Sequence, residues 1–148
     1  MRVELSREND IADLVRRALA EDVGPGDITT EATVPEGRTA LGRIKAKAHG
    51  VVAGMMVAEA VFSAVDPGLD FQADCTDGTR VAPGDHVAVI GGAARSLLVA
   101  ERTALNFLQH LSGVATATAA AVRLVQGSGV RLLDTRKTTP AMRVLEKY

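Results

Sequence analysis

The chain has 148 residues, of which 47% are hydrophobic, and a formal net charge of −1 at pH 7. This length and apolar content suffice for one ordinary domain, or for one small domain and part of another, and they exclude a disordered chain. The nearly balanced charge argues against a protein that binds nucleic acid, because neutralising phosphates requires a surplus of basic residues.

The cysteine content and the hydropathy pattern exclude further classes of protein. Cys75 is the single cysteine of the sequence, which excludes an intramolecular disulfide and a cysteine cluster for a metal. No basic and then apolar leader follows Met1, and no apolar run reaches the length of a membrane span. We therefore expect a soluble, cytoplasmic protein that has no membrane partner.

The first predicted element is a helix over residues 6–22, whose apolar residues recur at three- and four-residue spacings. Gly24-Pro25-Gly26 then forces a turn. For Asp27 we favour an Asx-type turn. The alternative is a cation site that Asp27 would form with Glu21 and Asp22.

Residues 39–92 are predicted to form strands around one helix. Weak alternation over 39–52 favours a half-exposed antiparallel strand. A helix of small residues is expected over 54–65. Short strands are expected over 71–74 and 86–90, and Gly91-Gly92 is expected to close this region. A helix with several short strands and turns indicates an α+β sandwich over about residues 1–92.

Residues 96–111 contain no glycine or proline and are predicted to form a helix. Its core-facing residues form one apolar line, which consists of Leu97, Ala100, Ala104, Leu108 and Leu111. A second face carries Arg102, Asn106, Gln109 and Gly113, and it is either a solvated face or the close approach of a neighbouring subunit. Ser112-Gly113 is expected to break or kink the helix before a second helix over 114–125.

The stretch over residues 130–140 is the strongest candidate for a binding site. Its first part, residues 130–133, is an apolar run that predicts a buried strand, and residues 134–139 are polar without interruption. Ligands of α/β folds bind at the carboxyl ends of strands. Arg136 and Lys137, with Arg102 on the preceding helix, suit a substrate with two or more carboxylates or phosphates. The alternative is a strand followed by a solvated, charged turn.

A helix, a glycine turn, an apolar strand, a polar tip and a further helix follow one another, as in an α/β barrel or a doubly wound sheet. We predict an N-terminal α+β open sandwich with its linking helix over residues 1–112. Residues 113–148 are predicted to be the start of an α/β barrel. One strand cannot form a stable sheet. We therefore expect that the barrel is truncated in this chain, or that the rest of it comes from elsewhere.

Several kinds of chemistry have no support in the sequence. There is no glycine-rich phosphate loop and no Gly-x-Ser-x-Gly nucleophile elbow. His49, His86 and His110 lack the spacing of metal ligands, and Cys75 has no neighbouring cation to activate it. We therefore predict no metal ligand and no covalent catalytic residue in this chain. A cationic site of this kind would act through position and electrostatics.

Three segments, in order along the chain, resemble the quinolinate phosphoribosyltransferases. Residues 101–116, which read ERTALNFLQHLSGVAT, are similar to the signature helix of that family. Residues 134–140, DTRKTTP, with Arg143 and with LEKY at 145–148, resemble its first barrel strand and the helix that follows. Residues 21–30 resemble its N-terminal turn. Ala141 departs from the family, which commonly has glycine after this proline.

The resemblance implies transfer of phosphoribose from phosphoribosyl pyrophosphate to quinolinate, with Mg²⁺ and with decarboxylation. The products would be nicotinate mononucleotide, pyrophosphate and CO₂, a step of de novo NAD biosynthesis. It further implies that Arg136 and Lys137 bind the quinolinate carboxylates with Thr135 beside them. Arg102 would reach the site of the neighbouring subunit in a homodimer.

The barrel of this family continues past Tyr148 and carries the remaining phosphate and Mg²⁺ ligands, so we expect these 148 residues alone to be inactive. Two alternatives stay open. One is a related phosphoribosyltransferase that acts on another acceptor. The other is a non-catalytic module that only dimerises or binds.

Overall fold

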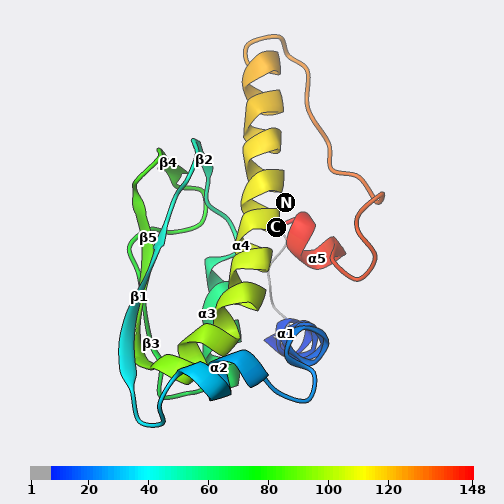
Figure 1. Cartoon of the computed structure of the whole chain (residues 1–148). Coiled ribbons are helices and arrows are strands. Elements are labelled where there is room, and N and C mark those ends of the chain that lie inside the picture. The colour runs from blue at the N-terminus through cyan, green and yellow to red at the C-terminus, as the bar shows by residue number, and fades with distance from the viewer. Residues whose placement is uncertain (1–7) are drawn as a thin grey trace.

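The structure is a computed structural model that describes residues 8–148, with side chains described from Ile11 onward (Figure 1). A small sheet lies on one side, and the long helix α4 crosses it and extends past it. The elements in chain order are α1 (Glu8–Val23), α2 (Ile28–Thr33), β1 (Thr39–Lys45), β2 (Gly50–Val51), α3 (Met55–Val65), β3 (Asp70–Ala73), β4 (Arg80–Val81), β5 (His86–Ala93), α4 (Ala94–Val125) and α5 (Arg143–Glu146).

The sheet is antiparallel and has the order β1-β5-β3, while β2 and β4 form a separate pair. The strand predicted over 39–52 is confirmed as antiparallel in β1, where Gly42 and Ile44 are half-buried and the other residues are exposed, but the chain turns before β2. Gly91-Gly92 does not close the region as expected, because β5 continues to Ala93. The reason is close packing: a Cβ on Gly92 would lie 2.7 Å from Leu69 Cδ2.

The core lies between the sheet and the helices α3 and α4, with α1 packed on their other side (Figure 1). The apolar line predicted for residues 96–111 is buried throughout. Ala100 and Ala104 are 0% exposed, so the backbone of α4 approaches its neighbours closely. Thr103 and Phe107 are buried as well, because α1 covers a second face of α4.

The break predicted at Ser112-Gly113 is wrong, because α4 is one continuous helix of 32 residues. A glycine inside a helix costs only about 1 kcal/mol relative to alanine. The hydroxyl of Ser112 does not end the helix, since its Oγ accepts a hydrogen bond from the Ala53 amide at 3.0 Å. One turn later, Thr116 Oγ1 accepts a bond from the Val51 amide at 2.8 Å. These contacts attach β2 to the middle of α4 and support the helix across the glycine.

The buried strand predicted over residues 130–133 is not formed. This segment has no regular structure, and Val130 and Leu133 are 59% and 86% exposed. An extended segment becomes a strand only when a neighbour satisfies its backbone hydrogen bonds, and within residues 8–148 no strand lies beside it. The helix predicted after it forms as α5, with Leu145 in the core. None of the helices in the described part of the chain has the length and apolar character to cross a membrane.

The N-terminus of α3 depends on a glycine, and this gives a testable prediction. Gly54 has φ 101°, and a Cβ there would lie 2.7 Å from Cδ1 of the buried Leu111. Gly84 has a similar φ of 97° but no atom within 4 Å of an added Cβ. Gly54→Ala should therefore lower the free energy of unfolding by about 1–3 kcal/mol more than Gly84→Ala. Denaturant titration of both variants measures this difference. An equal loss of unfolding free energy in the two variants would show that the Leu111 side chain moves aside at no cost in stability.

Candidate functional site

Arg102 is held at the end of α1 by Asp22. Its Nη1 lies 3.2 Å from Asp22 Oδ1, and the hydroxyl of buried Thr103 donates to Asp22 Oδ2 at 3.3 Å. The side chain of Asp22 is only 22% exposed, whereas that of Arg102 is 72% exposed. The carboxylate therefore fixes one end of a guanidinium that otherwise faces solvent. This contact joins two of the three segments that the sequence singled out.

Asp27 makes the local hydrogen bonds expected of an Asx-type residue, but as the N-cap of a helix. Its Oδ1 accepts from the Thr30 amide at 3.0 Å, and its Oδ2 accepts from the Thr30 hydroxyl. The pKa of Asp27 is lowered by these bonds and, to a lesser degree, by the charge of Arg102. The capped helix is α2, which the sequence analysis missed; an acceptor just before a Thr-rich, acid-containing segment was the available signal.

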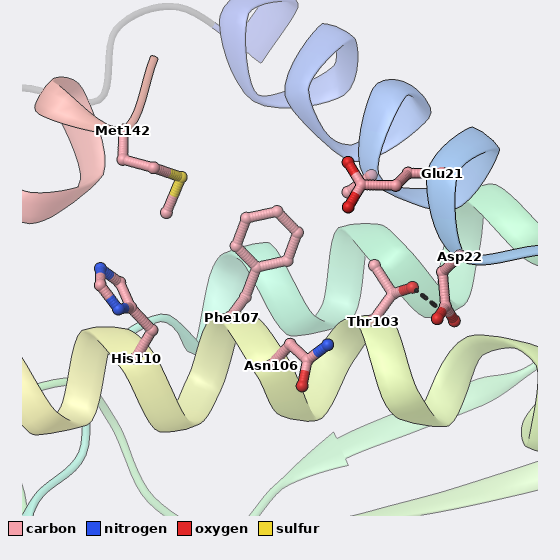
Figure 2. A pocket seen from close by; sticks show the side chains of 8 residues that line it. Glu21, Asp22, Thr103, Asn106, Phe107, His110 and Met142 are labelled. Carbon is pink, nitrogen blue, oxygen red and sulfur yellow. Dashed lines mark hydrogen bonds between the residues drawn. The ribbon is translucent and has the colours of Figure 1, made fainter. Parts of the chain in front are cut away.

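A cavity of about 350 Å³ lies between α1, α4 and Met142 (Figure 2). Figure 2 shows Glu21 and Asp22 on α1 facing Thr103 and Asn106 on α4. The full lining consists of Ala18, Glu21, Asp22, Thr103, Asn106, Phe107, His110 and Met142. Two of the three motif segments, residues 21–30 and 101–116, thus border one cavity, and Met142 lies just after residues 134–140 of the third. Of the four predicted site residues, none lines it.

The predicted contacts Thr135, Arg136 and Lys137 form one exposed turn in the linker between α4 and α5. Thr135 Oγ1 accepts a hydrogen bond from the Lys137 amide at 3.1 Å, which closes the turn. Among the side chains that the structure describes, from Ile11 onward, those of Arg136 and Lys137 have no hydrogen bond or ion pair. In the same part of the chain, no such bond connects this turn to Arg102. The structure therefore brings the three residues of the turn together and leaves Arg102 separate.

The segment that follows this turn is attached to α4 by Glu146 of α5. His110 Nε2 lies 2.7 Å from Glu146 Oε1, and the Thr139 amide donates to Glu146 Oε2 at 3.0 Å. The Glu146 side chain is 11% exposed. Its pKa is lowered, first by the hydrogen bond from the Thr139 side chain and then by His110. The spacing of His110 excluded it as a metal ligand, but no pattern in the sequence indicated this partner 36 residues away.

Cys75 is half-buried, and its Sγ lies 3.8 Å from the carbonyl oxygen of Val87. Burial raises the pKa of the Cys75 thiol, and the charges of Asp74 and Asp77 raise it further. A thiol with a raised pKa is a poor nucleophile, in agreement with the inert role predicted for it.

The lowered pKa of Glu146 predicts how the attachment of α5 responds to acid. A carboxyl whose pKa is lower in the folded protein stabilises the fold above its ordinary value of 4.5. That contribution is lost as the pH falls from this value through the lowered pKa. In an NMR titration, the Glu146 carboxyl should titrate below 4.5, and the α5 resonances should change with it. Glu146→Gln keeps the acceptor but cannot titrate, so the same α5 change in this variant would contradict the assignment.

Two family models match this chain. The model described as quinolinate phosphoribosyl transferase, N-terminal domain, matches residues 27–112, and that of the C-terminal domain matches residues 114–148. The nicotinate-nucleotide pyrophosphorylase [carboxylating] of Mycobacterium leprae is 45% identical over 139 residues, which cover 92% of this chain and 49% of that protein. Quinolinate phosphoribosyltransferase [decarboxylating] 1b of Nicotiana tabacum is 38% identical over 94% of this chain and 39% of its own length.

Comparison of the fold with solved structures finds relatives of the same kind. The solved nicotinate-nucleotide pyrophosphorylase from Francisella tularensis superposes with a TM-score of 0.89 at 35% identity, over 95% of this chain and 50% of that chain. The chain thus spans about half the length of the relatives it matches. Since the two family models together match residues 27–112 and 114–148, the chain belongs to the quinolinate phosphoribosyltransferase family.

Proposed function

We propose that this chain is the N-terminal half of an enzyme that transfers phosphoribose from phosphoribosyl pyrophosphate to quinolinate. Decarboxylation would accompany the transfer and give nicotinate mononucleotide, pyrophosphate and CO₂, as in de novo NAD biosynthesis. The names of the relatives from Mycobacterium leprae and Nicotiana tabacum support this activity. Because the match covers about half of the relative's length, it supports an active site of which this chain carries only a part.

The observation that carries the proposal is the exposed pair of Arg136 and Lys137, whose charges have no partner among the described side chains of residues 11–148. Quinolinate has two adjacent carboxylates. A guanidinium binds a planar carboxylate through two parallel hydrogen bonds, and an ammonium supplies a mobile point charge for a second one. We assign Arg136 and Lys137 to the two carboxylates. The hydroxyl of Thr135, already bonded to the Lys137 amide, keeps the turn closed beside them.

In the proposed reaction, a bond forms between the pyridine nitrogen and the anomeric carbon of the ribose. The bond from that carbon to pyrophosphate breaks, and later a proton replaces the carboxylate that leaves as CO₂. Arg136 and Lys137 would bind and orient quinolinate and neutralise its carboxylates, so this chain contributes position and electrostatics.

Mg²⁺ is the proposed cofactor, and the described residues do not fit it. Among residues 8–148 there is no group of three or more histidine, cysteine or acidic side chains placed to hold a metal ion. Asp22 and Asp27, which were candidates for a cation site, instead interact with Arg102 and Thr30. We therefore place the Mg²⁺ ligands outside this chain and derive no step from the metal.

The proposal is tested by restoring the missing half. We define the extended protein as residues 1–148 followed by the C-terminal half of the Mycobacterium leprae relative. It should form nicotinate mononucleotide from quinolinate and phosphoribosyl pyrophosphate, and residues 1–148 alone should not. Nicotinate, with one carboxylate, is the control acceptor. An extended protein that uses nicotinate as well as quinolinate would favour a relative with another acceptor. Turnover by residues 1–148 alone would contradict the half-site proposal.

We also propose a homodimer in which Arg102 reaches the site of the neighbouring subunit, and a cytoplasmic location. The exposed guanidinium of Arg102, fixed at one end by Asp22, supports the first point. The single, free Cys75 suits a reducing compartment, which supports the second.

Mixing two variants of the extended protein tests whether Arg102 acts across the dimer. One subunit carries Arg102→Ala and the other Arg136→Ala, and each variant alone should have little activity. In the heterodimer, one of the two sites combines an intact Arg136 with an intact Arg102 from the other subunit. Random mixing in equal amounts should therefore restore about a quarter of the wild-type sites. If Arg102 acts within its own subunit, the mixture regains nothing.

A further inference from the structure

The turn that carries Arg136 and Lys137 is not held by burial. The linker over residues 126–142 has no helix or strand, and the turn itself is exposed (Figure 1). Leu133, just before it, is 86% exposed. Apolar packing therefore cannot define the direction in which the two cations point, and polar contacts must do so.

These polar contacts come from α5 and the residue after it. Arg143 uses two separate donors: Nε donates to Thr138 Oγ1 at 3.3 Å, and Nη2 donates to the carbonyl oxygen of Arg136 at 3.3 Å. One guanidinium thus bridges the two residues on either side of Lys137. On the N-terminal side of the turn, Lys147 Nζ lies 2.6 Å from Asp134 Oδ2.

The helix α5, from which these contacts are made, is itself held in place. Leu145 is 5% exposed and belongs to the main core, and Glu146 joins His110 of α4 to the Thr139 amide. The side chain of Lys147 is 21% exposed, so its ion pair is partly shielded from water. Residues 134–139 are therefore attached to α4 at several points through one short helix.

We propose that Arg143, Glu146 and Lys147, which we call the α5 staple, position Arg136 and Lys137 for a ligand with two carboxylates. This role rests on the proposed function. Because the backbone of the turn is already held, a ligand that binds has to order only the side-chain rotamers of the two cations. The loss of conformational entropy on binding is therefore smaller, and the affinity is higher. The staple binds the backbone and the flanking side chains of the turn, and both cations stay without partners among the side chains described over residues 11–148. Its members are positioning residues.

Arg143→Ala tests the staple in residues 1–148 without any substrate. Loss of the guanidinium should speed amide hydrogen exchange at Lys137 and Thr139 about tenfold, because the neighbouring residues Arg136 and Thr138 are then no longer held by Arg143. Arg131→Ala is the matched control, since Arg131 is exposed in the same linker and has no hydrogen bond or ion pair in the described part of the chain. Unchanged exchange in Arg143→Ala, or an equal rise in both variants, would overturn the proposal.

Kinetics of the extended protein test whether the staple acts through Arg136. Arg143→Ala should raise the KM for quinolinate about tenfold and leave the KM for phosphoribosyl pyrophosphate unchanged. In an Arg136→Ala background the same change should have little further effect, because residues that act through one another are not additive. A purely structural role predicts a lower melting temperature with an unchanged quinolinate KM, and independent effects predict additivity. Either result would overturn the positioning role.

The two experiments separate the two proposals. If the wild-type extended protein folds but has no activity with quinolinate, the proposed function fails, and hydrogen exchange still decides whether the staple holds the turn. If it is active and Arg143→Ala changes neither exchange nor KM, the staple fails and the proposed function stands.

Discussion

The packing of α4 against α3 and the sheet is the constraint on which the rest of the structure depends. Its apolar line is buried from Leu97 to Leu111, and Ala100 and Ala104 have no exposed surface. Because a helix is rigid over this length, its polar residues keep fixed offsets from that line. Arg102 therefore faces α1, His110 faces α5, and Ser112 and Thr116 bond to the backbone around β2.

The motif residues divide into those that hold the structure and those that stay free for a ligand. Asp22 uses its carboxylate on Arg102 and Thr103, and Glu146 uses its carboxylate on His110 and Thr139. Buried or partly buried acceptors are satisfied in this way, as folded proteins require. The cavity in Figure 2 borders two of the motif segments, residues 21–30 and 101–116, and none of the predicted ligand contacts lines it.

Sequence periodicity was reliable where local signals and tertiary packing agree. It identified α3 and most of α4, because each has a buried face whose spacing matches a helix, and it identified β1, in which Gly42 and Ile44 are half-buried and Arg43 and Lys45 are exposed. It failed at Gly113, where contacts of Ser112 and Thr116 support the helix through a residue that weakens it. It failed again over residues 130–133, because an apolar run becomes a strand only if another strand lies beside it.

The sequence by itself determined the family, the order of its motifs and the identity of the cations, because these depend on residue types and local spacing. Tertiary structure alone decided which of those residues meet. Asp22 lies 80 residues from Arg102, and His110 lies 36 residues from Glu146. Hydrogen bonds over such separations depend on how whole helices pack, and no local pattern encodes them. The attachment of the cationic turn to α5, and through it to α4, is a property of the fold.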